Sequence, residues 1–485
     1  MSVGADRVVK SREQGRGSGN RWAALFALYL AMFMNILDVS VVNLALPSIR
    51  QGLGATDTEL EWVLVVYVLS FAAGLLPFGR FGDVIGRDRV FVWGVAGFTL
   101  SSLGCGLAPD ITALIAARAV QGLCAAAMVP QVLAIVHVIF SGADKGKAIG
   151  LFGSVSALGA VAGPLVGGAV VAADFYSLGW RPIFLMNLPI GLVSLLGVLR
   201  LLPPFPGGSR VRPDWLGTAL YALAVLALVF PLVEGRQFGW PLWCMALMGI
   251  GAALAVLFFR RQQVNARQGR AQVLPAALTR DGVFVFGLVF VTLFFSCLMG
   301  SFFMLAVLLQ SGLGLDAMKA GLTLAPHPAG VILASALTGR LGGRWLAGRI
   351  AAATLVVLCG LAAIRFVVAS AAAPEALMLP LLVVGLGTGT AIPALFQLAL
   401  SRVASADAGA GSGALQAFQQ VGMAFGVGIQ GQIFFQGIRS DAGAANYLEA
   451  AATTMLYPVS VAAGLFVFSL VAWYGTVKKS GWPSR

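Results

Sequence analysis

One acidic residue, Asp38, lies deep within a long apolar run of this 485-residue sequence, between Trp22 and Leu46. A charged side chain costs several kcal/mol inside a membrane, so an ionisable residue in such a run is a functional candidate by default. A neighbouring cation favours the ionised carboxylate, whereas removal from water favours the neutral form. A change of surroundings would therefore load and release a proton at Asp38.

Arg118, in another apolar run, is the expected partner of Asp38. If the first run ends outside near Pro47 and the fourth begins there near Thr112, Asp38 lies nine residues deep and Arg118 six. At a helical rise of about 1.5 Å per residue these depths are about 14 and 9 Å, within reach of long side chains or one water. A fixed ion pair or helix–helix hydrogen bond, without proton turnover, is the alternative.

A glycine-rich stretch, GAVAGPLVGG, occupies the fifth apolar run. Gly159, Gly163 and Gly167 recur every four residues, so they share one helix stripe that another helix can approach closely. Pro164 removes a backbone donor and can bend that stripe, and Gly168 completes the run. Such a contact suits a gate, and close packing without a gating role is the alternative.

Polar, aromatic and sulfur-containing residues within other runs are weak candidates for a substrate cavity. Three glutamines in the thirteenth run recur at i, i+3 and i+4, a stripe that should face protein or a cavity rather than lipid. The ninth run offers soft and aromatic surface to a hydrophobic substrate, although such residues also serve lipid contact or core packing. The candidates are Asn35, Gln121, Phe295, Met299, Phe302, Gln416, Gln419 and Gln420.

His327, between two prolines in LAPHPAG, is a secondary titratable candidate. Its alternative role is to hydrogen-bond local backbone groups. The five cysteines all fall within apolar runs, and no metal-ligand spacing, nucleotide-binding loop or nucleophile with a base is evident. The sequence therefore predicts no enzyme, no metal and no cofactor, and the energy for any work must come from an ion gradient.

The elements that must position these residues are membrane helices. The chain is 59% hydrophobic and only 11% charged, whereas soluble domains carry about a quarter charged residues. The apolar runs are about 20 residues long, as a helix needs to cross ~30 Å of hydrocarbon. Fourteen spans are predicted: 22–47, 60–78, 90–108, 112–138, 148–173, 182–201, 215–233, 241–259, 282–309, 320–338, 350–370, 376–400, 412–435 and 453–476. The first is too long for a signal-peptide core and is expected to be retained.

The basic residues set the expected orientation. With the termini and alternate loops assigned to the cytoplasm, 25 of the 32 Lys and Arg lie on that side, as the positive-inside rule requires. We therefore expect a multi-pass protein of a cytoplasmic (inner) bacterial membrane with both termini in the cytoplasm, and the net charge of +13 needs no nucleic-acid partner. The predicted parts are a tail (1–21), a six-helix bundle (22–202), a linker with two additional spans (203–280), a second six-helix bundle (281–477) and a tail (478–485).

Several motifs occur in order along these spans. LDVSVVNLALP (37–47), GRFGDVIGRDR (79–89), LIAARAVQGLCAA (114–126), GAVAGPLVGG (159–168), WRPIFLMNLPIG (180–191) and DWLG (214–217) are present. Together they resemble the fourteen-span drug/proton antiporter branch of the major facilitator superfamily. An internal echo of the second motif, GRLGGRWLAGR at 339–349, indicates two related halves. The resemblance implies an all-α major facilitator fold of 6 + 2 + 6 helices, with two pseudo-symmetric bundles around a central cavity.

The same resemblance assigns roles to individual residues. The loop motif would hold the two halves together on the cytoplasmic side in the outward-facing state, through Gly79, Gly82, Asp83, Gly86 and Arg87. Asp83 can cap or face a helix N-terminus and pair with Arg87; a solvated loop is the alternative. Val84, Asp88 and Cys124 depart from the usual motifs, which concerns details of gating rather than the family.

The expected function is secondary active export of hydrophobic or monocationic drug-like compounds in exchange for protons, by alternating access and as a monomer in the lipid bilayer. A dedicated exporter of an endogenous metabolite, antibiotic or siderophore is the alternative within transport. A membrane sensor or scaffold that transports nothing is a remote alternative of another class.

Overall fold

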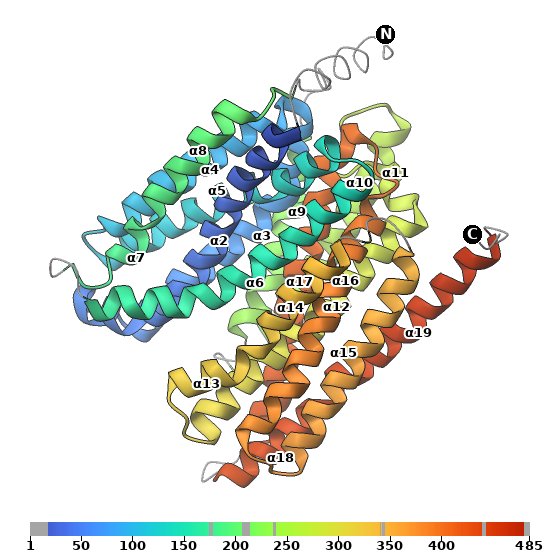
Figure 1. Cartoon of the computed structure of the whole chain (residues 1–485). Helices are drawn as coiled ribbons and strands as arrows, with labels where there is room; N and C mark the ends of the chain where they lie inside the picture. The colour runs from blue at the N-terminus through green and yellow to red at the C-terminus, as the bar shows by residue number, and fades with distance from the viewer. Residues whose placement is uncertain are drawn as a thin grey trace.

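The computed structural model consists of helices joined by loops, with no strand among the residues that it describes, which are 18–173, 178–205, 214–235, 239–339, 341, 345–438 and 443–479 (Figure 1). Eleven helices in these ranges are long and apolar enough to cross a membrane. Three more long helices, α4, α6 and α17, take the remaining places in the predicted set of fourteen spans. The predicted all-α membrane fold is therefore confirmed.

The helices follow the chain in three groups. The first group is α2 (Ser18–Leu53), α3 (Asp57–Ile85), α4 (Arg87–Gly106), α5 (Ile111–Ile139), α6 (Gly142–Ala173), α7 (Pro182–Leu185) and α8 (Asn187–Leu201). Two helices follow, α9 (Trp215–Glu234) and α10 (Leu242–Arg267). The last group is α11 (Ala276–Arg280), α12 (Gly282–Val307), α13 (Ala317–Leu324), α14 (Pro326–Gly339), α15 (Leu346–Ala369), α16 (Met378–Leu400), α17 (Ala408–Gln436), α18 (Ala444–Thr454) and α19 (Leu456–Lys479).

Three predicted spans are each divided into two helices by proline. The first pieces, α7, α13 and α18, end at Leu185, Leu324 and Thr454, and a proline lies four residues after each of these ends. Proline has no N–H to donate to the carbonyl four residues earlier, so the α-helix is interrupted there. The last span consequently begins at Ala444, not near residue 453 as predicted.

The two outer groups repeat one packing pattern. In the first group α2 packs on α6 and α8, and α5 packs on α3 and α4. In the last group α12 packs on α17 and α19, and α16 packs on α14 and α15. These are the same positions within each set of six spans, so the two bundles are pseudo-symmetric. The contacts between bundles obey the same symmetry, because α3 packs on α17 and α14 packs on α6.

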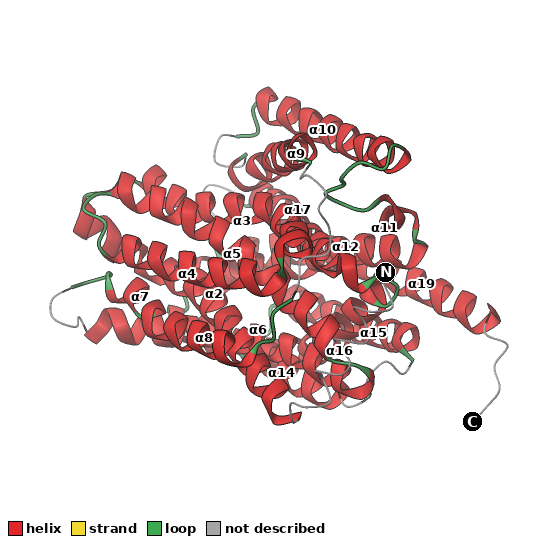
Figure 2. Cartoon of the chain, turned by 90° about the horizontal axis from the view of Figure 1, so that it is seen from above, coloured by secondary structure: helices red, strands yellow, loops and turns green. Residues whose placement is uncertain are grey.

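The additional helices α9 and α10 lie side by side outside the two bundles, where α9 packs on α3 and α17 and α10 packs on α9 (Figure 2). Asp214 fixes their connection, since its carboxylate accepts the N–H of Gly217 at 3.0 Å and pairs with Arg261 of α10 at 2.7 Å. Tyr221 of α9 donates to the carbonyl of Ala72 in α3 at 3.0 Å. Asp214 of the DWLG motif thus caps the N-terminus of α9 and links α9 to α10 through Arg261.

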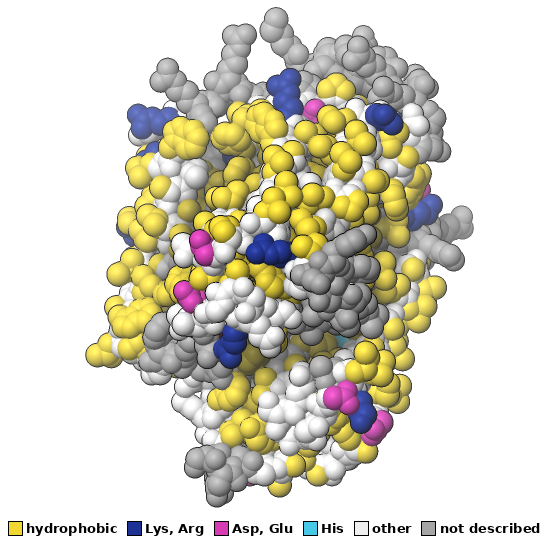
Figure 3. All heavy atoms as spheres, turned by 90° about the vertical axis from the view of Figure 1, so that its left-hand side faces the viewer, with side chains coloured by type: hydrophobic (Ala, Val, Ile, Leu, Met, Phe, Trp, Pro, Cys, Tyr) yellow, Lys and Arg dark blue, Asp and Glu magenta, His cyan; other side chains and the backbone are white. Residues whose placement is uncertain are grey.

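Both ends of the described chain lie at one end of the bundles, where α2 begins and α19 finishes (Figure 1); we call this the terminal end and the other the opposite end. The face in Figure 3 is mainly hydrophobic, with scattered charged side chains and a recess between the upper and lower parts of the view. Many large apolar side chains are exposed along the long helices. Such a surface is suited to lipid rather than to water.

The contact between α12 and α17 yields a stability prediction. A β-carbon added to Gly426 would lie 2.2 Å from the carbonyl oxygen of Ser296, so Gly426→Ala must push two backbones apart. We expect a loss of about 1–3 kcal/mol in the free energy of unfolding, measured as a lower melting temperature of the purified protein. Gly464→Ala in α19 is the matched control, because an added β-carbon meets nothing within 4 Å there. Equal melting temperatures would contradict this account of the packing.

Candidate proton site and terminal-end gate

The carboxylate of Asp38, on α2, is held by donors from two other helices. Its Oδ2 accepts from Nη1 of Arg118 on α5 at 2.6 Å. Its Oδ1 accepts from Nε2 of Gln121 on α5 at 3.1 Å and from Nδ2 of Asn187 on α8 at 2.9 Å. Both oxygens of this buried carboxylate are thus hydrogen-bonded.

Arg118 is equally well bonded. Its Nη1 also donates to Oε1 of Gln121 at 2.6 Å, and its Nε donates to the carbonyl of Val63 on α3 at 3.2 Å. The guanidinium carbon lies 4.2 Å from the centre of the Tyr67 ring and 5.8 Å from that of Phe184. Aromatic faces attract a desolvated cation, so the bundle compensates both charges of the ion pair.

The cluster is closed to solvent in this structure. Asp38, Arg118, Gln121, Asn187 and Ser102 are each at most 1% exposed. Breaking one side of such a buried pair is costly, because the other charge then remains desolvated and unpaired. Access of solvent to Asp38 therefore requires the surrounding helices to move.

The glycine stripe of α6 packs on the other face of the same helix that carries Asp38. A β-carbon added to Gly163 would lie 2.2 Å from Cβ of Ser40, and Gly159 and Gly167 make similar close approaches to α2. Residues two positions apart on a helix point in nearly opposite directions, about 200° apart. α2 therefore lies between the glycine stripe and the Asp38 cluster.

The glycine motif lies within one long helix. α6 runs without interruption from Gly142 to Ala173, and the side-chain surroundings of Pro164 and Gly168 lie outside the described residues. The close contact with α2 therefore rests on Gly159, Gly163 and Gly167.

The loop motif between α3 and α4 closes the terminal end against the other bundle. Asp83 accepts the backbone N–H groups of Gly409 and Ala410, both at 2.8 Å, and so caps the N-terminus of α17. Its Oδ1 also binds Nη2 of Arg87 at 2.6 Å. Gly86 joins α3 to α4 with a φ of +123°, which side-chain-bearing residues rarely adopt.

Two arginines of the same loop extend this contact between bundles. Arg87 also donates to the carbonyl of Ser405, and Arg80 pairs with Asp407 at 2.8 Å. The helices themselves meet without intervening side chains, because a β-carbon on Gly79 would lie 2.4 Å from the carbonyl oxygen of Gly409. Gly82 leaves room for Gln131, whose Nε2 donates to the carbonyl of Phe78.

The symmetric contact between α6 and α14 closes the other side of the terminal end. A β-carbon on Gly150 would lie 3.0 Å from the carbonyl oxygen of Ser335 and 3.1 Å from Cα of Gly339. Gly339 opens the second copy of the loop motif, of which residues 340 and 342–344 lie outside the described residues. We call these two sets of contacts, α3–α17 and α6–α14, the terminal-end gate.

The weak cavity candidates do not form one group. Asn35 accepts a hydrogen bond from Tyr67 within the first bundle, and Gln121 belongs to the Asp38 cluster rather than to an exposed wall. Gln416 is buried and bonds to the carbonyl of Ser412. Partly exposed positions include Gln419 and Gln420.

The ninth-run candidates also point to different surroundings. Phe295 is buried, Met299 is 38% exposed, and the Phe302 ring packs at 4.4 Å from the ring of His327. Nε2 of His327 is buried without a hydrogen-bond partner among the described residues. These side chains therefore do not converge on one polar site.

Sequence reasoning missed Asn187 and Ser102 as members of the Asp38 cluster. Asn187 stands in the motif WRPIFLMNLPIG, and a polar residue in an apolar span was the available signal. Arg80 and Asp407 were also missed, because no local pattern joins residues so far apart in the chain.

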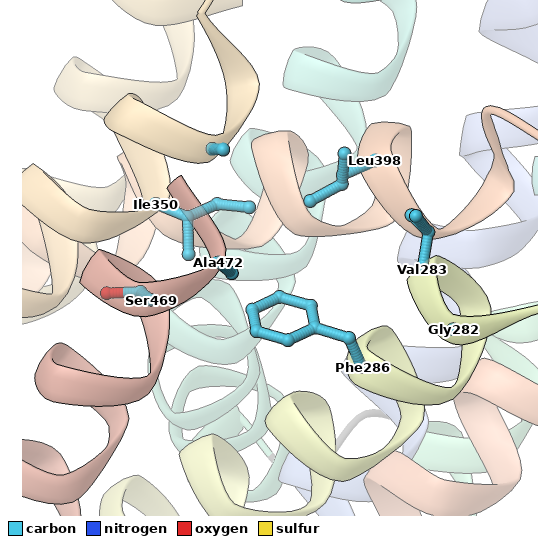
Figure 4. A pocket seen from close by; sticks show the side chains of 8 residues that line it. Gly282, Val283, Phe286, Ile350, Leu398, Ser469 and Ala472 are labelled. Carbon is cyan, nitrogen blue, oxygen red and sulfur yellow. The ribbon is translucent and has the colours of Figure 1, made fainter. Parts of the chain in front are cut away.

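An apolar cavity of about 200 Å³ lies elsewhere, at the terminal end of the second bundle (Figure 4). Phe286, Ile350, Leu398 and Ser469 contribute to its wall. Its lining comes from α12, α15, α16 and α19 alone, so it has no part in the Asp38 cluster.

Known proteins share both the sequence and the fold. A family model described as Major Facilitator Superfamily matches residues 28–229 and 215–427. The chain belongs to the Major Facilitator Superfamily. Two solved structures of this superfamily show the same fold: the proton:xylose symporter XylE (TM-score 0.63, 13% identity, 92% of this chain and 95% of that one) and the human organic anion transporter MFSD10 (0.62, 15%, 92% and 100%).

Curated relatives of this major facilitator protein place it in the drug-efflux branch. The probable actinorhodin transporter of Streptomyces coelicolor is 39% identical, over 87% of this chain and 74% of that protein. The puromycin resistance protein pur8 of Streptomyces alboniger is 35% identical, over 84% and 81%. The methylenomycin A resistance protein of Bacillus subtilis is 30% identical, over 87% and 89%. Family and fold point to transport across a membrane rather than to catalysis.

The buried ion pair generates a stability prediction. Arg118→Met leaves the Asp38 carboxylate buried without its cation, so we expect a loss of about 3–5 kcal/mol in unfolding free energy. Adding Asp38→Asn to this variant should recover much of that loss. Lys147→Met is the control, because its pair with Asp144 is about half exposed and should contribute about 0–1 kcal/mol. Chemical unfolding in detergent measures all four proteins; equal losses for the two cations would refute the assignment.

The cap on α17 generates a prediction about opening. Asp83→Asn removes charge-assisted hydrogen bonds worth about 1.5–3 kcal/mol each, so the terminal end should open at least about tenfold more often. The reporter is Ser412→Cys, at a fully buried interface position, in a chain without its native cysteines. Its rate of maleimide labelling should rise with Asp83→Asn and stay unchanged with Asp144→Asn at the same end. An unchanged rate in both would remove Asp83 from the gate.

Proposed function

We propose that the protein exports hydrophobic or monocationic drug-like compounds in exchange for protons, by alternating access. The observation that carries this proposal is the carboxylate of Asp38, which is 1% exposed and paired with Arg118 inside the first bundle of a drug-efflux fold. Such a group can couple a proton to a conformational change, because protonation removes the charge that Arg118 and two amides stabilise.

The position of α2 supplies a route for the coupling. One face of α2 carries Asp38, and its other face packs on the glycine stripe of α6. The same α6 meets α14 in the terminal-end gate. We propose that a change of charge at Asp38 alters the packing of α2 on α6. The resulting shift of α6 would then change its contact with α14 in the terminal-end gate. The glycines allow the helices to slide at short distance because no side chain separates them.

The conformation in this structure fits the outward-facing state of an alternating-access cycle. The terminal end is closed by the Asp83 cap and by the α6–α14 contact. We propose that the terminal end is cytoplasmic, as the excess of Lys and Arg in its loops favours. Proton entry from outside would then neutralise Asp38 and favour release of substrate, and proton loss to the cytoplasm would restore the gate-open state for loading.

Dedicated export of one endogenous compound is the second candidate. It is favoured by relatives named for single compounds, such as the probable actinorhodin transporter and the cephamycin export protein CmcT of Amycolatopsis lactamdurans. Deleting the gene in its own organism and profiling secreted metabolites alongside drug susceptibility separates the two candidates, because a dedicated exporter changes the secretion of one compound family.

A susceptibility panel in an efflux-deficient bacterial host tests the leading proposal. The wild type should raise the inhibitory concentration of some hydrophobic or monocationic drugs, and Asp38→Asn should return it to that of the empty vector, because the neutral amide binds no proton. Asp144→Asn, which alters an exposed carboxylate, should protect as the wild type does. Equal protection by Asp38→Asn at equal membrane expression would exclude Asp38 from coupling.

A further inference from the structure

Asn187 shares the buried carboxylate of Asp38 with Gln121, but differs from it in one respect. Both amide groups donate to Oδ1 of Asp38 and to Oγ of Ser102, at 2.9 and 2.9 Å from Asn187 and at 3.1 and 3.2 Å from Gln121. The carbonyl oxygen of Gln121 accepts from Arg118 at 2.6 Å, which fixes the orientation of that amide. Oδ1 of Asn187 is buried and has no hydrogen-bond partner among the described residues.

A protonated Asp38 would need an acceptor that the present arrangement does not offer. Oδ2 faces the guanidinium of Arg118, and Oδ1 faces two N–H₂ groups, so an added hydrogen on either oxygen meets a donor. A buried donor left without an acceptor destabilises the folded protein. Some neighbouring group must therefore turn an acceptor toward the neutral carboxyl group.

The other groups around Asp38 are already committed or lack a suitable oxygen. α5 presents Arg118, whose partners are described above. α3 presents the Tyr67 hydroxyl, which donates to Asn35, and α4 presents the Cys105 thiol, which donates to Gln121.

The remaining helices packed on α2 add no charge near Asp38. α6 carries its charged side chains in its first turns only, at Asp144, Lys145 and Lys147, and α7 carries none. Oδ1 of Asn187 on α8 is therefore the one acceptor oxygen among the described groups of the cluster that has no hydrogen-bond partner.

We propose that Asn187 is a positioning residue for the proton on Asp38: its amide rotates by half a turn when the proton arrives and presents Oδ1 to the carboxyl group. The rotation exchanges two atoms of nearly equal size, so it needs no repacking of the apolar surroundings. Ser102 keeps its hydrogen bond from Gln121 while it loses the one from Asn187. The proton is thereby sensed by α8 and α4 as well as by α2 and α5.

This inference rests on proton uptake by Asp38, and its test separates the two. Infrared difference spectra between alkaline and acidic pH are recorded on the full chain in lipid nanodiscs. The wild type should show a carboxylic-acid carbonyl band that Asp38→Asn removes, together with a change in an asparagine side-chain carbonyl band. Labelling asparagine side chains with carbon-13 identifies that second band without any substitution at residue 187.

Two variants on α8 make the test specific. Asn187→Leu, of similar size and without polar atoms, should shift the Asp38 band to higher frequency and abolish the labelled asparagine signal. Ser194→Ala is the matched control, since Ser194 is also fully buried on α8 and bonds to the carbonyl of Ala27 instead; both bands should stay in place.

The infrared spectra distinguish a failure of proton uptake at Asp38 from a failure of the role proposed for Asn187. If no Asp38-dependent band appears at acidic pH, both the proton coupling and the role of Asn187 are overturned. If that band appears but neither moves in Asn187→Leu nor is accompanied by the labelled asparagine signal in the wild type, the role of Asn187 is overturned and the coupling at Asp38 stands.

Discussion

A carboxylate inside an apolar bundle has to be supplied with donors by the helices around it, and this requirement organises the first half of the molecule. Asp38 on α2 accepts hydrogen bonds from Arg118 and Gln121 of α5 and from Asn187 of α8. Arg118 adds α3 through the carbonyl of Val63. Four helices are thus fixed about one charge, and a change in that charge alters what all four are bonded to.

Close helix contacts are the second constraint, because they determine what can move. Glycine brings α6 against α2 at Gly163 and α3 against α17 at Gly79. The first contact lies on the helix that carries Asp38, and the second belongs to the terminal-end gate. Asp83 accepts hydrogen bonds from the backbone N–H groups at the N-terminus of α17, and these bonds exist only while the two bundles touch there. An ionisable centre and a separable interface thus lie on adjoining helices.

The sequence predicts the helical membrane fold, the two related halves and the depth of Asp38 and Arg118, because apolar length and charge position are local properties. The rotation of each helix about its own axis cannot be predicted in this way, because the spans are apolar on nearly all sides. No periodicity in the sequence therefore indicated that Gln121 joins the ion pair instead of lining a cavity. The sequence also does not give partners distant in the chain. Asp83 carries a recognisable capping pattern, yet only the packing of α3 on α17 shows which N-terminus it caps.

We propose that Asp38 carries the proton that drives export. Proteoliposomes with an imposed pH gradient test it most directly, with substrate-dependent proton flux and substrate exchange at equal pH measured on the same preparations. We predict that Asp38→Asn abolishes the proton flux while exchange of substrate persists, because the helices still alternate but no proton is bound. Undiminished proton flux in Asp38→Asn would contradict it.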